Sequence, residues 1–150
     1  GHLVLTTLHT NNTLKTLHRL INMGIEPYHL VGCINLIICQ RLVRKLCPFC
    51  KTAINNKDKS LTEQALNVAL YHHTIYKAGS CSQCSNGFHS REGIFEISVP
   101  SASMQQAILN LSLPIENESL TLQDIKSDGL KKVKQGITTL EEVKRVTDME

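Results

Sequence analysis

The sequence predicts an α/β protein, and two stretches near its start indicate this class. Residues 1–9, GHLVLTTLH, are rich in Val, Leu and Thr, which favour a β-strand. The polar residues TNN follow, and residues 13–23 then place leucines at helical spacing before Gly24, a residue that commonly ends a helix. A strand, a short turn and a helix make up the repeating unit of a parallel sheet.

The rest of the chain continues the alternation of helices and strands. Residues 26–46 carry apolar side chains at positions 30, 31, 34, 37, 38 and 42, which predict one long helix with Pro27 in its first turn. A polar stretch then leads to a predicted helix that begins with a capping box at residues 60–63. Strands are predicted at 74–79 and 91–100, and helices at 101–111, 120–136 and 138–147. The last of these helices has capping-box spacing between Thr138 and Glu141.

The composition is that of an ordinary globular protein. The 150 residues are 41% hydrophobic and 19% charged, with a net charge of +3. Only 4% are aromatic and there is no Trp, so stacking surfaces for single-stranded nucleic acid are nearly absent and no nucleic-acid partner is expected. The longest apolar stretch, residues 30–39, contains Asn35 and is shorter than the roughly 20 residues that span a bilayer.

Four of the six cysteines form two C-x-x-C pairs, and residues 51–80 separate the pairs. Two intervening residues allow both thiolates of a pair to face one ion, and a second pair completes a tetrahedron. Free thiols and a disulfide within each pair are the alternatives, but paired C-x-x-C motifs favour Zn²⁺. Four thiolates leave no open coordination position, so the site is predicted to be structural. Its ligands are Cys47, Cys50, Cys81 and Cys84.

Several further residues bear on this metal site. His72, His73 and His89 are possible substitute ligands, although four thiolates suffice. Cys33 and Cys39 are predicted to pack in the core as small apolar residues. Such cysteine usage suits a reducing compartment, so the protein is expected in the cytoplasm. Because residues 47–84 contain few apolar side chains, loss of the metal is expected to loosen this segment and to leave the strand-and-helix core around residues 1–46 and the terminal helices folded.

Two histidines bracket the first predicted strand. Their spacing of seven residues would place His2 and His9 on opposite faces of one straight strand. His9 comes at the carboxyl end of the strand, where open α/β sheets place ligands, so a ligand-binding role and a structural role both stay open for it. A structural role is favoured for His2. The chain lacks the phosphate-binding patterns G-x-x-x-x-G-K-[ST] and G-x-G-x-x-G.

Five stretches together resemble one family. GHLVLTTLHTN, MGIEPY, QRLVRKLCPFC, CSQCSNGFHSREGIFE and DGLKKVKQGITTLEEVKRVT are similar to the carboxyl-terminal part of the secretion ATPases, the hexameric RecA-like motors of type II secretion and type IV pilus assembly. The resemblance implies the C-terminal portion of a RecA-like ATPase domain, with an inserted tetracysteine zinc subdomain and a helical C-terminal region. It also implies three regions. Residues 1–46 would be the C-terminal part of the RecA-like core, with the histidine-box strand and helices, residues 47–84 the zinc subdomain, and residues 85–150 a closing strand and the C-terminal helices.

The resemblance also implies site residues and cofactors. His2 and His9 match the two histidines of the family's histidine box, a catalytic motif near the nucleotide γ-phosphate and the subunit interface, and His9 is expected nearer the chemistry. The Walker A, acidic-box and Walker B motifs that precede this box in the family are expected before residue 1. The chain alone is therefore expected not to hydrolyse ATP. ATP and Mg²⁺ are the implied cofactors of the full-length protein, besides structural Zn²⁺.

The implied partners are five further copies in a homo-hexamer and the inner-membrane platform proteins of a secretion or pilus system. The implied location is the cytoplasm, peripheral at the inner face of the bacterial inner membrane. One departure is Ser90, which stands where the family often has Gly in Gly-Tyr/Phe-x-Gly-Arg, so the form of that turn stays open. The alternatives are a stand-alone zinc-ribbon binding module and a dithiol redox protein. The first would need a dense basic patch with aromatics, and the second one exposed reactive pair.

Overall fold

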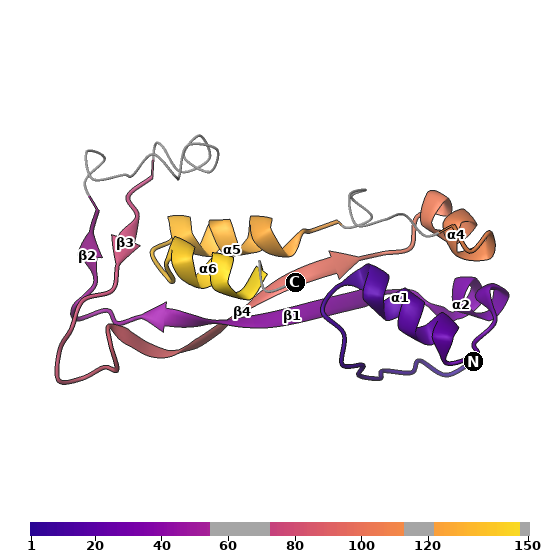
Figure 1. Cartoon of the computed structure of the whole chain (residues 1–150), viewed down its shortest axis with the longest axis horizontal. Helices are drawn as coiled ribbons and strands as arrows, with labels where there is room; N and C mark the ends of the chain where they lie inside the picture. Colours follow the sequence, from indigo (N-terminus) through magenta and orange to yellow (C-terminus); the bar gives the residue numbers. More distant parts are fainter. Residues whose placement is uncertain (55–72, 113–121, 148–150) are drawn as a thin grey trace. The chain divides into compact units, whose positions relative to one another are not determined.

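The computed structural model describes residues 1–54, 73–112 and 122–147, which form helices and short sheets (Figure 1). This confirms a mixed α/β protein. Strand β1 pairs with β4, and β2 pairs antiparallel with β3. The helix predicted from residue 60 lies outside the described residues. In chain order the elements are α1 Thr13–Asn22, α2 Pro27–Cys33, β1 Ile37–Leu46, β2 Thr52–Ala53, β3 Tyr76–Lys77, β4 Phe88–Ser98, α4 Ala102–Leu109, α5 Ile125–Lys134 and α6 Leu140–Thr147.

The chain folds into two compact units, and each unit is made from two segments. The first unit contains residues 1–40 and 95–124, and the second contains residues 41–94 and 125–150. Strands β1 and β4 each contribute residues to both units. The division at residues 46 and 84 that the sequence suggests stays a prediction.

Helix α1 anchors the first unit and confirms the helix predicted at its position. The side-chain oxygen of Asn12 accepts a hydrogen bond from the backbone N–H of Lys15 at 2.8 Å, which caps the helix. The Glu96 carboxylate on β4 accepts another from the N–H of Thr13 at 2.8 Å. The apolar core of this unit is formed by Leu17, Leu30, Ile37, Cys39, Met104 and Ile108.

The long helix predicted for residues 26–46 is wrong in its second half. Helix α2 ends at Cys33, and β1 takes up residues 37–46. Burial alternates along β1: Ile37 and Cys39 are buried, whereas Ile38 is 56% exposed. This period of two belongs to a strand, and pairing with β4 satisfies the backbone polar groups that a helix would satisfy internally. The apolar residues of this stretch fit the period of a helix and that of a strand. Pairing with β4 therefore decides which of the two structures forms.

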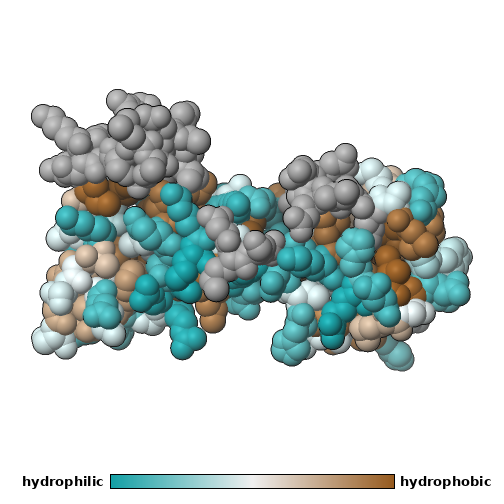
Figure 2. All heavy atoms as spheres, viewed as in Figure 1, coloured by the Kyte–Doolittle hydropathy of each residue, from teal (hydrophilic) through white to brown (hydrophobic). Residues whose placement is uncertain are grey.

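The strand predicted for residues 1–9 is also wrong. Residues 1–10 have no regular secondary structure, and Leu3, Val4 and Leu5 are 82%, 76% and 89% exposed. A strand is stabilised by hydrogen bonds to a neighbouring strand, and neither of the described sheets includes these residues. Apolar side chains, brown in Figure 2, reach the surface in the part of the molecule that carries α1, α2 and α4.

In the second unit, α5 and α6 pack side by side against residues of β1 and β4. The pair approaches closely at Gly129, where an added Cβ would lie 2.6 Å from Cγ1 of Val143. Helix α5 ends before Gly136, which has a φ of +66° and confirms the predicted end. The core of this unit is formed by Val43, Ile75, Ile94, Ile125, Val133, Leu140, Val143 and Val146.

The start of α6 lies one residue later than its sequence suggests. The hydroxyl of Thr139, not that of Thr138, accepts a hydrogen bond from the N–H three residues on, at Glu142 (3.3 Å). Thr138 instead donates its hydroxyl to the backbone oxygen of Arg44 on β1 at 2.8 Å. The long-range contact therefore selects which threonine caps the helix.

Ser90 adopts a backbone conformation that glycine tolerates better. Its φ is +66°, a left-handed value that costs a side-chain-bearing residue about 1–2 kcal/mol. We expect Ser90→Gly to raise the free energy of unfolding by about 0.5–1 kcal/mol, after allowing for the greater backbone entropy of glycine. Urea denaturation measures this difference. Ser90→Ala keeps the strained Cβ and should give no gain, so equal effects of both variants would contradict the explanation.

Candidate metal centre

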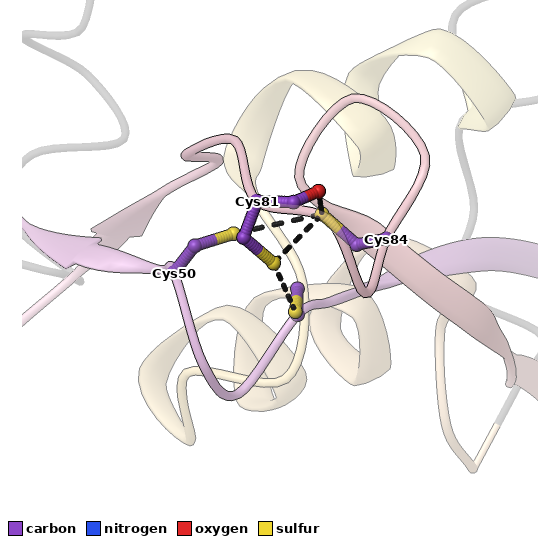
Figure 3. A group of neighbouring side chains, drawn as sticks. Cys50, Cys81 and Cys84 are labelled. Carbon is purple, nitrogen blue, oxygen red and sulfur yellow. Dashed lines mark hydrogen bonds between the residues drawn. The ribbon is translucent and has the colours of Figure 1, made fainter.

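The four cysteines of the two C-x-x-C pairs converge in the second unit. Their sulfur atoms all lie within 4.8 Å of one another. The Sγ–Sγ distances are 3.8 Å from Cys47 to Cys81, 3.7 Å from Cys50 to Cys84, and 3.5 Å from Cys81 to Cys84. Figure 3 shows the side chains of Cys50, Cys81 and Cys84 pointing toward one another. All six cysteines of the chain are free thiols in the structure.

These distances fit a single metal ion. A regular tetrahedron of sulfurs around zinc, with Zn–S bonds of about 2.3 Å, has edges of about 3.8 Å. The three sulfur–sulfur distances of 3.5–3.8 Å match this edge. Among the described residues this is the group whose side chains could hold a metal ion. His73 and His89 are exposed and outside the group, and His72 is not among the described residues.

The first pair is held by the end of β1. Cys47 follows the last residue of β1, and its backbone N–H donates to the oxygen of Gly87 at 2.8 Å. The N–H of Lys51 donates to the oxygen of Cys47 at 3.1 Å, which closes the turn that brings Cys50 beside Cys47. The strand thus fixes one ligand, and a local turn fixes the other.

The second pair is held by a tight hairpin. Ser85 and Phe88 exchange two backbone hydrogen bonds, of 3.1 and 3.0 Å, around Asn86 and Gly87. Both central residues have positive φ, of 52° and 82°, as a type I′ turn requires. The dipeptide Asn-Gly is the strongest short signal for such a hairpin, but the elements predicted from the sequence do not include this turn.

Two glycines let the two pairs approach each other. A Cβ at Gly79 would lie 2.0 Å from the backbone oxygen of Cys50, and one at Gly87 would lie 2.5 Å from the oxygen of Gly79. Any larger residue would therefore push the backbones of the two knuckles apart. Gly87 belongs to the Asn-Gly signal, whereas no local pattern indicates that Gly79 must be small, because its neighbour lies far away along the chain.

The thiols do not ionise alike. Partial burial and then the neighbouring Cys84 thiol raise the pKa of Cys50 to about 12. Partial burial also acts to raise the pKa of Cys84, but hydrogen bonds at the backbone of Cys81 and Gly87 and with the other thiols outweigh it and lower that pKa to about 7. Cys84 therefore ionises more readily than Cys50, and the contact with Cys84 raises the pKa of Cys50 further. A divalent cation would remove this penalty by compensating the negative charges.

The remaining cysteines and the histidines lie elsewhere. Cys39 is buried in the core of the first unit, as predicted, but Cys33 is exposed, so its predicted burial is wrong. His2 and His9 are exposed. His9 borders an open depression of about 520 Å³ along α1, which is lined by His9, Thr10, Asn11, Lys15, His18, Arg19, Asn22 and Met23. The structure does not bring His2 into this depression or either histidine into the group of four thiols.

Comparison with known proteins identifies the family. The sequence profile described as "Type II/IV secretion system protein" matches residues 1–145. The chain belongs to this family. The resemblance to the secretion ATPase family is therefore confirmed.

Relatives in the type II/IV secretion system protein family include a pilus assembly ATPase and a type II secretion protein. The chain is 38% identical to the type IV pilus assembly ATPase PilB of Acinetobacter baylyi, over 98% of this chain and 27% of the relative. It is 40% identical to the type II secretion system protein E of Dickeya dadantii, over 100% of this chain and 30% of the relative. The chain thus spans less than a third of the length of these relatives.

Neither of these two relatives is named as a zinc module or a dithiol redox protein. Among residues 1–54, 73–112 and 122–147, every helix is too short or too polar to span a bilayer.

Proposed function

We propose that this chain is the carboxyl-terminal part of an ATPase that powers assembly of a type II secretion pseudopilus or a type IV pilus. The observation that carries the proposal is the similarity to the pilus assembly ATPase and the secretion protein E along 98% and 100% of the chain. The full-length protein would form a homo-hexamer of RecA-like domains. It would work in the cytoplasm, at the inner face of the inner membrane, and would act on inner-membrane platform proteins.

The four clustered cysteines would hold one structural Zn²⁺. The sulfur–sulfur distances of 3.5–3.8 Å and the all-thiolate donor set support zinc over oxygen-preferring cations. Four protein ligands fill the coordination sphere, so the ion would stabilise the fold and would not take part in hydrolysis. Its binding energy would hold Cys47, Cys50, Cys81 and Cys84 together across the segment between them.

His2 and His9 would form the histidine box, with His9 nearer the γ-phosphate. Hydrolysis of ATP needs Mg²⁺ and a loop that cradles the phosphates, and these 150 residues contain no such loop sequence. The phosphate-binding loop would therefore come from another part of the full-length protein, and this chain would contribute His9 near the γ-phosphate. The cationic side chains of Lys15 and Arg19, which line the same depression as His9, are compatible with a negatively charged neighbour.

A chimera tests this function. The corresponding carboxyl-terminal part of the Acinetobacter baylyi pilus assembly ATPase is replaced by this chain, and phosphate release is measured with ATP and Mg²⁺. We expect the chimera to hydrolyse ATP and the isolated chain not to. His9→Ala in the chimera should lower kcat by about a hundredfold with little change in KM, because the side chain would act on the transition state.

His29→Ala is the matched control, because His29 is also exposed but lies on α2, outside the residues that line the depression at His9. It should leave kcat unchanged, whereas His2→Ala should act mainly through stability. A folded chimera without activity would contradict the proposed function. Equal and small effects of His2→Ala and His9→Ala would contradict the histidine-box assignment and leave the ATPase assignment standing.

A further inference from the structure

The turn between α5 and α6, residues 135–139, makes two hydrogen bonds with β1 and one with the metal-binding segment. We call these residues the α5–α6 turn. The backbone N–H of Leu46 donates to the oxygen of Ile137 at 2.8 Å, and the hydroxyl of Thr138 donates to the oxygen of Arg44 at 2.8 Å. The Nζ of Lys51 donates to the oxygen of Gly136, also at 2.8 Å.

The three hydrogen bonds join the α5–α6 turn to different parts of the chain. Arg44 and Leu46 belong to β1, which is held by its pairing with β4 and by the apolar core around Val43. Lys51 lies one residue after Cys50, within the turn that the first C-x-x-C pair forms. The bond from Lys51 is therefore the one among the three whose geometry depends on the metal ligands.

The surroundings of Lys51 fix the direction of its side chain. Its Nζ lies 4.6 Å from the centroid of the Tyr76 ring on β3, a cation–π contact. Gly136 packs directly against the Tyr76 ring and the Lys51 side chain. An added Cβ at Gly136 would lie 2.8 Å from two carbons of the ring and 3.3 Å from Nζ of Lys51. The positive charge also sits at the carboxyl end of α5, where the helix dipole favours a cation.

We propose that Lys51 couples the metal centre to the α5–α6 turn, so that metal binding orders this turn and the start of α6. The inference rests on the metal site of the proposed function. Holding Lys51 still costs side-chain entropy, since a free lysine populates many rotamers. When Cys50 is fixed as a ligand, the backbone that carries Lys51 is fixed with it, and the bond to Gly136 forms at a smaller cost.

Ordering of the α5–α6 turn would also stabilise α6, because a residue of the turn caps this helix. Thr139 in the α5–α6 turn caps the helix at Glu142, and the Glu142 carboxylate accepts hydrogen bonds from Arg44 and Arg145. A disordered turn would therefore loosen the first turn of α6 before the strand pairing is affected. Lys51 acts as a positioning residue: it would not bind the metal and would not touch substrate.

Hydrogen exchange followed by mass spectrometry tests the coupling in the full 150-residue chain. In the wild type, removing zinc with a chelator should speed amide exchange in peptides covering residues 134–142 by about tenfold. Lys51→Met should also speed exchange at these residues while zinc is still bound, but by less than the chelator does, because zinc loss also loosens the core that Ile75 shares with Val133 and Leu140. Zinc content, measured by metal analysis, should stay at the wild-type level in this variant. Lys51→Arg, which keeps a charged donor, should restore slow exchange.

Lys77→Met is the matched control, because Lys77 is an exposed lysine on β3 beside Tyr76. It should leave exchange in the α5–α6 turn at the wild-type rate. Slow exchange in zinc-bound Lys51→Met would overturn the coupling, as would a wild-type turn that does not respond to the chelator. Loss of zinc from Lys51→Met would place Lys51 in the metal centre itself and also overturn it. A wild-type chain that binds no zinc would overturn the metal site as well.

Discussion

Replacing Cys47 by serine is expected to lower the zinc content of the purified chain from one ion per chain to nearly none. A structural zinc site contributes roughly 10–16 kcal/mol of binding free energy in small domains, and it requires ionised ligands. A serine hydroxyl stays protonated at neutral pH and cannot replace the thiolate. The same loss is expected at Cys50, Cys81 and Cys84, because all four sulfurs belong to one cluster. Metal analysis under reducing conditions measures the stoichiometry.

The other two cysteines are the controls. Cys33→Ser and Cys39→Ser should keep full zinc content, because both residues belong to the first unit and neither is part of the cluster. Loss of zinc from the Cys33 variant, or a wild type without zinc, would show that the wrong four residues have been assigned.

The structure also changes where the effect of metal loss should appear. The sequence suggests that the helices after residue 84 remain folded without metal. In the structure, Ile75 from the metal-binding segment shares one core with Val133 of α5 and Leu140 of α6. We therefore expect hydrogen exchange in the Cys47→Ser variant to increase in α5 and α6 as well as around residues 47–84. Helices α1, α2 and α4, which have their own core, should keep wild-type exchange.

Replacing Glu142 by glutamine is expected to lower the free energy of unfolding at pH 7 by about 3 kcal/mol. The side chain is only 3% exposed and pairs with Arg44 of β1 and Arg145 of α6. The N–H of Arg44 also donates to it, at 3.1 Å. Burial by itself raises the pKa of the Glu142 carboxyl, but the hydrogen bonds from the two arginines and this N–H outweigh burial and lower it to about 2.

This depressed pKa sets the pH window. The carboxyl of Glu142 has an ordinary pKa of 4.5, so its stabilising contribution is complete above pH 4.5 and is lost as the pH falls toward 2. Urea denaturation at pH 7 and pH 3 should therefore show that the difference between wild type and Glu142→Gln shrinks in acid. Comparing the two proteins at each pH cancels the acid sensitivity of the thiolate site, which both share.

Glu141→Gln is the matched control for this prediction, because Glu141 is the exposed neighbour in the same helical turn. It should change stability by less than about 0.5 kcal/mol at either pH. A difference between wild type and Glu142→Gln that is the same at pH 7 and pH 3 would contradict the assignment of the stabilisation to the ionised carboxylate.

The sequence by itself determined the features that near neighbours control. The cap at Asn12, the leucines that follow it and the end at Gly24 predict α1, because a helix is stabilised by residues three and four apart. The two C-x-x-C pairs predict their own convergence, because each pair forms a local turn whose spacing suits one ion. The strand β4 and the glycine that ends α5 follow from similarly local signals.

The tertiary structure decided what depends on partners far along the chain. Residues 37–46 fit both a helix and a strand, and pairing with β4, some fifty residues later, makes them a strand. Residues 1–9 have the composition of a strand but take part in neither described sheet, so they adopt no regular structure. Gly79 and Lys51 reveal their roles only where the fold brings Cys50 and Gly136 against them. Local signals state what a segment can form, and long-range packing selects among those forms because burial and backbone pairing belong to the whole fold.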